Sequence, residues 1–259
     1  MIYIIYLLIM TLILIFVFYQ IQFFMMFTPT YHKRDALNDD FELLSITMND
    51  GIELEGVIYE PHKIQKDELK TVLFFAGRSH DSVALIKKLS ENFPQVRIIT
   101  FNYRSYGESQ GRVSEKNLFE DGEHIANVIE KNYGEFYLLG FSLGTTIATH
   151  IASKTKTKAL FLIGAFDSIA LLSKERFGIG ASWIWRYKFE TIKTIKNVYA
   201  PCYIFSSRND KTTYVKNARN LKNSVQNLVT YMEFETLTHK ELLWNKKVIK
   251  KINGVINEA

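Results

Sequence analysis

The sequence predicts an α/β fold: an eight-stranded, mostly parallel sheet with helices on both faces, preceded by one apolar helix. Short continuous apolar runs alternate with helical stretches through most of the 259 residues, which is typical of strands buried in a parallel sheet. Two of these runs flank Asn49-Asp50-Gly51, a strong hairpin turn, so we expect the sheet to begin with an antiparallel pair. The N-terminal stretch is set apart because it carries no charge.

That N-terminal stretch has the length and composition of a membrane span. Residues 1–19 are uncharged, and the apolar run continues to Phe27 with only two glutamines in it. About 20 residues of helix cross a hydrocarbon core of roughly 30 Å. A cleaved signal peptide would need a basic start and a small-residue cleavage site, and neither is present. A hydrophobic helix packed on the domain is the other alternative. We therefore predict a transmembrane anchor over residues 1–28.

The residues around the anchor predict its orientation. No basic residue precedes it, whereas Lys33 and Arg34 follow it directly, so the positive-inside tendency places the following domain in the cytoplasm. The single cysteine, Cys202, opens an apolar strand and is expected to be a buried hydrophobe. A lone cysteine fits a reducing compartment.

Residues 29–259 suffice for one sizeable α/β domain. We expect its strands at residues 43–48, 52–59, 71–75, 96–101, 136–141, 159–164, 202–206 and 229–234. The helices between them are expected at residues 81–92, 114–132, 145–154 and 214–223. The net charge of +5 includes lysine clusters at residues 154–158 and 246–251. Because no nucleic-acid-binding module accompanies these clusters, we predict solvated faces, with anionic lipid headgroups as the alternative partner.

The most informative motif is Gly140-Phe141-Ser142-Leu143-Gly144, which follows a predicted strand and leads into a predicted helix. A serine at such a sharp turn has strained backbone angles. Glycines two residues to either side let neighbouring backbone pass close, so the hydroxyl stands clear of the sheet. The motif therefore predicts Ser142 as a nucleophile. A glycine-rich loop that merely ends a core strand is the alternative.

A serine hydroxyl is a weak nucleophile and must give its proton to an adjacent base. In the order Ser, then Asp or Glu, then His, which is typical of this turn, His239 alone of the six histidines lies far enough downstream. It lies in a polar break between the last predicted strand and a C-terminal helix. We predict His239 as the base; a solvated loop histidine is the alternative.

Two carboxylates are candidates for the acid that orients this imidazole. Asp210 ends an apolar strand in a polar Ser-Ser-Arg-Asn-Asp turn, at the same edge of the sheet as Ser142. Asp167 follows the preceding strand but leads directly into Ser-Ile-Ala-Leu-Leu, where it is expected to cap a helix. We predict Asp210, which would hold the imidazole in one tautomer without taking its proton.

Attack on an acyl carbonyl puts negative charge on its oxygen, which needs fixed donors. We predict the backbone N–H of Leu143, at the start of the helix after the nucleophile, as one donor. The second is expected from the loop after the third strand, where Gly77 lets the chain turn toward the serine. We predict the backbone N–H of Arg78.

The order of these elements resembles the α/β-hydrolase fold, and residues 27–245 are similar to the small membrane-anchored serine hydrolases of the abhydrolase-domain group. Residues 101–111, Phe-Asn-Tyr-Arg-Ser-Tyr-Gly-Glu-Ser-Gln-Gly, match that group's Asp-Tyr-Arg-Gly-Tyr-Gly-x-Ser-x-Gly loop. Gly-Phe-Ser-Leu-Gly and Leu-Thr-His-Lys-Glu-Leu-Leu also fit. The chain departs from the group at Ala76, usually His, and at Asn102 and Ser105, usually Asp and Gly. These departures leave the candidate nucleophile, base and acid (Ser142, His239 and Asp210) in place. They leave open the shape of the loop after the third strand and the identity of the substrate.

Residues 166–201 separate the sixth and seventh strands, where α/β-hydrolases usually carry a lid. Aromatic residues are frequent in this segment, including Phe177, Trp183 and Trp185. They could form a short cap with an apolar acyl slot, and we name these three as candidate substrate-binding residues. Equally, the segment could be an amphipathic helix packed on the sheet.

Together these features predict a membrane-anchored serine hydrolase that cleaves carboxylic esters or acyl thioesters through an acyl-enzyme, with no metal or organic cofactor. The anchor favours lipid-derived substrates, and relatives in the resembled group that remove fatty acyl groups from proteins agree by analogy. One alternative is a serine peptidase of the same fold, which would need a site for the peptide's N-terminus or flanking chain. The other is a catalytically silent, membrane-tethered binding protein, which has no need of all three triad side chains.

Overall fold

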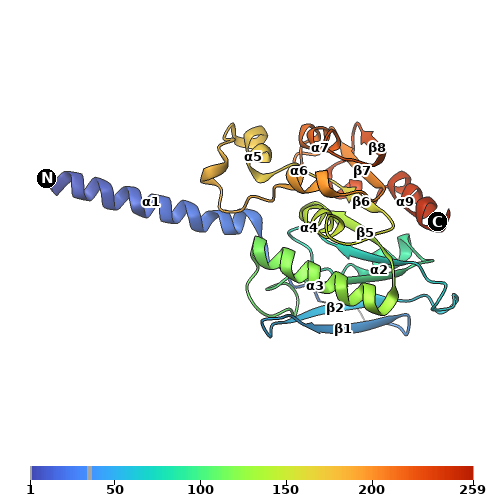
Figure 1. Ribbon diagram of the computed structural model, residues 1–259. Coiled ribbons are helices and arrows are strands. Elements are labelled where there is room, and N and C mark those ends of the chain that lie inside the picture. Colours follow the sequence, from blue (N-terminus) through green and yellow to red (C-terminus); the bar gives the residue numbers. More distant parts are fainter. Residues whose placement is uncertain (1, 34–36, 259) are drawn as a thin grey trace.

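The computed structural model describes residues 2–33 and 37–258, and in these residues eight strands form one sheet (Figure 1). The strand order is β1-β2-β4-β3-β5-β6-β7-β8. β2 runs antiparallel to both of its neighbours, β1 and β4, and the other neighbouring pairs are parallel. The predicted fold class is confirmed. Arg34, one of the two residues used above for orientation, lies outside the described residues.

Every predicted strand is present, with its ends within two residues of the expected positions. The strands are β1 (Phe41–Thr47), β2 (Glu53–Tyr59), β3 (Thr71–Phe75), β4 (Arg97–Phe101), β5 (Phe136–Phe141), β6 (Leu160–Ile163), β7 (Cys202–Ser207) and β8 (Leu228–Phe234). The four central parallel strands β3 to β6 are buried along their whole length, which explains their continuous apolar sequences. The edge strand β1 is largely exposed.

Helices cover both faces of the sheet and create two separate apolar cores. α3 (Glu115–Tyr133), α4 (Leu143–Ala152) and α7 (Val215–Lys222) bury side chains in one core. α2 (Ile86–Asn92), α8 (His239–Leu243) and α9 (Lys246–Glu258) bury side chains in the other. α2 begins five residues later than predicted, because Asp81 accepts the backbone N–H of Ala84 in a turn ahead of it.

A cap lies between β6 and β7, within the predicted residues 166–201. It contains α5 (Ile169–Phe177), the short turn η1 (Ser182–Ile184), α6 (Thr191–Thr194) and η2 (Ile195–Asn197). Glu115 at the start of α3 holds the cap by accepting the backbone N–H groups of Lys188 and Phe189, each at 2.6 Å. Cys202 at the start of β7 is buried, as predicted, and this burial raises the pKa of its thiol to about 12.

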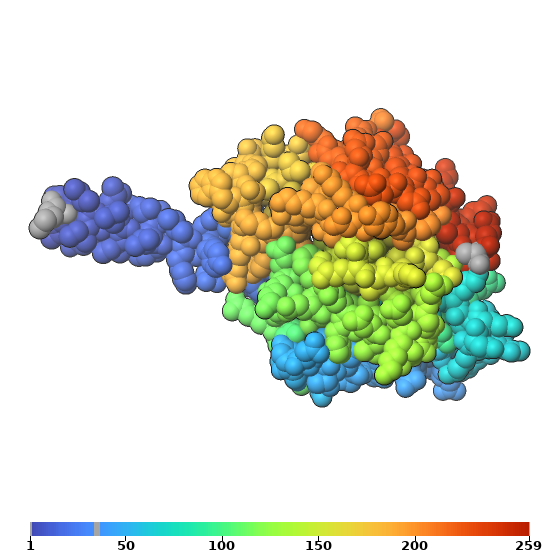
Figure 2. Space-filling view, viewed as in Figure 1, coloured from blue at the N-terminus to red at the C-terminus, as the bar shows by residue number. Residues whose placement is uncertain are grey.

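The N-terminal helix α1 (Ile2–Met26) projects from the body of the protein (Figures 1 and 2). It carries no charged side chain, and its most apolar window is not buried against the domain. Among the helices that the structure describes, α1 is the one long and apolar enough to cross a membrane. Only its last turns touch the body of the protein.

Candidate active site

Ser142 lies at a sharp turn between β5 and α4. Its backbone angles are φ 52° and ψ −117°, in the left-handed half of φ space that a residue with a side chain rarely occupies. A Cβ atom on Gly140 would lie 2.6 Å from the carbonyl oxygen of Gly144, and one on Gly144 would overlap the carbonyl oxygen of Phe75. Both glycines of the motif are therefore needed for α4 to pack this closely on β5 and β3.

Asp210 and His239 meet at the carboxyl edge of the sheet. Nδ1 of His239 lies 2.6 Å from Oδ2 of Asp210. The other carboxylate oxygen accepts the backbone N–H groups of Thr212 and Thr213, at 2.7 and 2.9 Å, and the Thr213 hydroxyl donates to Oδ2 at 2.8 Å. The Asp210 side chain is fully buried. Burial alone would raise its pKa, but the bond and charge of His239 and the two backbone donors hold the pKa below its ordinary value.

Asp167, the alternative acid, has different partners. It accepts hydrogen bonds from the backbone N–H of Ser168 and from the side chains of Asn217 and Asn220, at 2.7, 2.8 and 3.1 Å. Burial raises the pKa of Asp167. The expectation that Asp167 caps the following helix is wrong, because the cap of α5 is Ser168, whose hydroxyl accepts the backbone N–H of Leu171. The structure therefore brings Asp210, and not Asp167, to His239.

The His239 ring lies over the ends of β5 and β6, next to the serine turn. Its centroid is 4.8 Å from the ring of Phe141, the residue directly before Ser142. A Cβ atom on Gly164 would lie 2.9 Å from Cε1 of His239. His239 is the first residue of α8, and Thr238 and Glu241 form a capping box there, so it lies on a short helix rather than in the predicted loop.

Within residues 2–33 and 37–258, no hydrogen bond joins the Ser142 hydroxyl to His239. Catalytic hydrogen bonds are often long without substrate and tighten when it binds. Within the same residues, no group of three or more His, Cys, Asp or Glu side chains is arranged to hold a metal ion.

The loop after β3 lies against the serine turn. A Cβ atom on Gly77 would be 3.2 Å from the ring of Phe141, and the carbonyl oxygen of Ala76 faces Gly144. The backbone N–H of His80 donates to the carbonyl oxygen of Gly77 at 3.2 Å and closes a turn. Because the N–H and C=O of a trans peptide point in opposite directions, the N–H of Arg78 points away from that turn. The N–H of Leu143, in the first turn of α4, has no acceptor within its own helix.

Two tyrosines that the sequence reasoning did not single out hold this loop in place. The hydroxyl of Tyr103 donates to the carbonyl oxygen of Ala76 at 2.6 Å, and that of Tyr106 donates to the carbonyl oxygen of Arg78. Both tyrosines are buried. Together they fix the carbonyl groups on either side of the peptide that carries the Arg78 N–H. Their sequence motif matched the related group, but the sequence does not say which carbonyl each hydroxyl meets.

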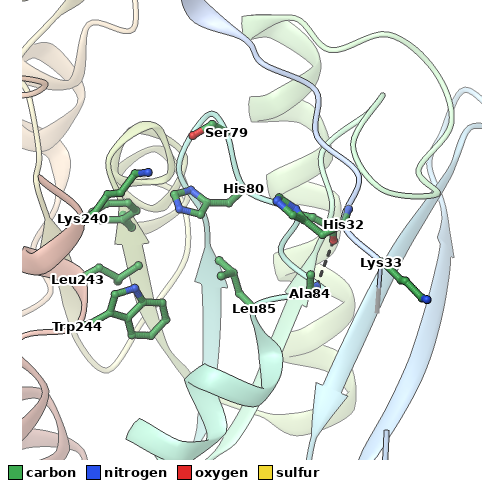
Figure 3. Close-up of a pocket in the computed structure, with 11 residues that line it drawn as sticks. His32, Lys33, Ser79, His80, Ala84, Leu85, Lys240, Leu243 and Trp244 are labelled. Carbon is green, nitrogen blue, oxygen red and sulfur yellow. Dashed lines mark hydrogen bonds between the residues drawn. The ribbon is translucent and has the colours of Figure 1, made fainter. Parts of the chain in front are cut away.

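A hollow of about 400 Å³ opens beside the serine turn and α8 (Figure 3). Phe141 and Lys240, the neighbours in sequence of Ser142 and His239, both line it. Its lining is mixed in charge: Lys33, Lys240, His32 and the carboxyl group of Asp81 all contribute, and Lys33 points away from the others in Figure 3. His80 also lines the hollow, and partial burial lowers the pKa of its imidazole. His80 was not predicted as a site residue.

The three cap aromatics lie in different surroundings. Phe177 and Trp185 line a small apolar cavity together with Met25 and Met26 of α1. Trp185 is buried, whereas Trp183 is 83% exposed and does not line the cavity. Phe177 is partly exposed at 48%. Their assignment to substrate binding stays a prediction.

Comparisons with known proteins agree with this fold. Residues 70–179 match a family model described as the alpha/beta hydrolase fold. The lysophosphatidylserine lipase of Macaca fascicularis is 25% identical over 178 residues, which cover 60% of this chain and 45% of that protein. A protein of Acanthamoeba polyphaga mimivirus is 24% identical over 230 residues, covering 79% of this chain and 77% of its own. The chain spans about half the length of the lipases that it matches.

Solved structures of esterases share the architecture. The Pyrococcus furiosus esterase Pf2001 superposes with a TM-score of 0.67 at 14% identity, covering 90% of this chain and 97% of the esterase. An acetyl xylan esterase from a Paenibacillus species superposes with a TM-score of 0.71 at 12% identity, covering 86% and 87%. The sheet topology and the family-model match over residues 70–179 show that the chain has the α/β-hydrolase fold, and its sequence is similar to lysophosphatidylserine lipases of the abhydrolase-domain group.

Proposed function

We propose that the protein is a membrane-anchored serine hydrolase that cleaves acyl esters of lipids with an anionic polar head. The observation that carries the proposal is the 2.6 Å contact between Asp210 and His239 beside the strained turn of Ser142. A buried carboxylate on one imidazole nitrogen leaves the other nitrogen available as a base for a nearby hydroxyl.

In the proposed reaction, the Ser142 hydroxyl attacks the acyl carbonyl while Nε2 of His239 takes its proton. Asp210 holds the imidazole by Nδ1 and stabilises the imidazolium. The N–H groups of Leu143 and Arg78 donate to the oxyanion. His239 then returns the proton to the leaving oxygen, and a water molecule, activated by the same imidazole, hydrolyses the acyl-enzyme.

Two features support a lipid substrate. Lys240, which lines the hollow beside the serine turn, is a cation for an anionic head, and the apolar side chains of Phe177 and Trp185 in the cap suit contact with an acyl chain. The name of the lysophosphatidylserine lipases points to the same chemistry. We further propose that residues 1–28 are the anchor, that residues 29–259 are the hydrolase domain, and that this domain faces the cytoplasm, as the charges after α1 favour.

The test uses the full chain in lipid nanodiscs and a fluorophosphonate probe, which labels reactive serines. We expect wild type and Ser153→Ala, a control at the far end of α4, to be labelled, and Ser142→Ala not to be. Labelling of Ser142→Ala at the wild-type level would refute Ser142 as the nucleophile. Substrate class is then measured by comparing lysophosphatidylserine with lysophosphatidylcholine, an acyl thioester and an aminoacyl amide. Preference for the amide would favour the peptidase alternative.

A further inference from the structure

The cap is attached to the last turns of α1. Gln22 is 1% exposed, and its amide donates to the carbonyl oxygen of Ile184 at 3.0 Å and accepts the backbone N–H of Arg186 at 2.6 Å. The ring of Trp185 lies 6.0 Å from that of Phe18. The guanidinium of Arg186 lies 4.6 Å from the centroid of the Tyr19 ring. Residues 184–186 of the cap therefore lie beside residues 18–22 of α1.

This attachment fixes the height of the cap along α1. From Ile2 to Phe18 the helix rises by about 24 Å at 1.5 Å per residue. The hydrocarbon core of a bilayer is roughly 30 Å thick. Residues 2–19 are exposed, as lipid-facing residues would be. If α1 crosses a bilayer as proposed above, the cap stands where hydrocarbon meets headgroups.

The cap presents large apolar side chains next to this attachment. Phe177 and Ile179 are 48% and 46% exposed, and Trp183, directly before Ile184, is 83% exposed. α5 ends at Phe177, and the next residue, Gly178, has a φ of 72° that turns the chain away from the helix axis before Ile179. Tryptophan is enriched at membrane interfaces because its ring is apolar and its N–H is polar. Figures 1 and 2 show the cap overhanging the base of α1.

The charges of this part of the cap favour an anionic surface. Lys174 and Arg176 are exposed beside the apolar side chains. The nearby acidic residues are already paired: Glu175 with Lys216 at 2.8 Å, and Glu190 with Lys193 at 2.7 Å. Basic residues beside a membrane span attract anionic headgroups.

We propose that residues 177–183 dock into the headgroup layer of the bilayer that α1 crosses, so that the cap is a second membrane contact. The inference rests on the proposed anchor and is independent of the proposed catalysis. α1 alone would leave the domain free to tilt, whereas two contacts hold the cap and its cavity against the lipid surface.

The test attaches an environment-sensitive NBD dye to single cysteines in the full chain. The native Cys202 is buried, so an introduced exposed cysteine takes the dye. Trp183→Cys reports the cap and Leu14→Cys reports α1. Tyr199→Cys is the matched control, because Tyr199 is a 77% exposed aromatic residue at the amino-terminal edge of the sheet. All three are placed in nanodiscs of phosphatidylcholine and phosphatidylserine containing a spin-labelled quencher lipid.

We expect the dyes at 14 and 183 to emit at shorter wavelength and to be quenched several-fold more than the dye at 199. If the dye at 183 has the same emission wavelength and quenching as the dye at 199, while the dye at 14 reports lipid, the proposed docking is wrong and the proposed anchor is supported. A dye at 14 that reports water would refute the anchor and the docking with it. Neither outcome bears on Ser142, whose labelling is measured separately.

Discussion

The carboxylate of Asp210 and the imidazole of His239 come from segments 29 residues apart and meet at 2.6 Å. Asp167 is just as buried, and it stands at the end of the neighbouring strand β6. The pKa of Asp210 lies below its ordinary value and that of Asp167 above it, because the imidazole and two backbone N–H groups stabilise the Asp210 carboxylate. Two similar residues at one edge of the sheet are thus distinguished by their partners.

This difference predicts opposite outcomes for two matched variants. Asp210→Asn is expected to lower kcat by about 10⁴-fold, because an amide favours the wrong imidazole tautomer. Asp167→Asn should leave kcat within a few-fold of wild type, since its partners are Ser168, Asn217 and Asn220. Steady-state hydrolysis of a lysolipid ester, normalised to folded protein, measures both. The reverse ranking would assign the acid to Asp167.

If the Arg78 N–H is the oxyanion donor proposed above, Tyr106→Phe is expected to lower kcat by about 10- to 100-fold with little change in KM, because the loop that carries this N–H loses one of its two tyrosine contacts. The matched control is Tyr59→Phe, which removes a buried hydroxyl from the carbonyl oxygen of Pro94 instead. Tyr106→Phe should lose more stability than Tyr59→Phe, because the Tyr106 hydroxyl also accepts the backbone N–H of Thr28 at 3.0 Å, so kcat is normalised to folded protein. Equal kcat values in the two would show that Tyr106 does not position the oxyanion donor.

Gly144→Ala should destabilise the protein by about 1–3 kcal/mol or more, because the new Cβ would overlap the carbonyl oxygen of Phe75. Gly254→Ala is the control with the opposite expected sign. Its Cβ would meet only Glu258, at 4.0 Å, and alanine stabilises a helix interior by roughly 0.5–1 kcal/mol relative to glycine. Denaturant titration of both variants in detergent measures the free energy of unfolding.

The stability of the fold should fall below neutral pH through His80. Partial burial lowers the pKa of His80 in the folded protein, so the unfolded chain binds a proton first, at about pH 6.5. The neutral His80 imidazole therefore contributes to the stability of the folded protein above about pH 6.5, and this contribution is lost as the pH falls through the pKa that His80 has in the folded protein. His80→Gln should reduce the dependence of the unfolding free energy on pH in this range. His62→Gln, which changes an exposed side chain, should not. If the unfolding free energy of His80→Gln depends on pH as in wild type, other groups cause the loss of stability.

Features set by the local sequence pattern could be predicted, whereas contacts between segments far apart in the chain could not. The strands were predictable because β3 to β6 are buried on both faces and therefore read as continuous apolar runs. Ser142, Asp210 and His239 could be selected as candidates because they follow β5, β7 and β8 at one edge of the sheet. The partners of Tyr103 and Tyr106 could not, since a hydroxyl's acceptor depends on how two loops approach each other.

Gln22 of α1 shows the same limit. In the sequence, Gln22 only interrupts an apolar run. The pattern of residues around it gives no sign of a contact with Ile184, 162 residues later. In the folded protein its amide satisfies both a carbonyl and an N–H of the cap. A buried amide with two backbone partners is a tertiary feature, and polarity patterns along one helix do not predict it.

Gln22→Ala is therefore expected to loosen the cap. Truncation leaves the carbonyl of Ile184 and the N–H of Arg186 without that partner, at a cost of about 1–3 kcal/mol for each buried group. Amide hydrogen exchange of residues 182–188 should accelerate, while exchange in β5 and α4 should not. Gln20→Ala, two residues earlier on α1, is the matched control. Equal exchange at the cap in the two variants would show that Gln22 does not join α1 to the cap.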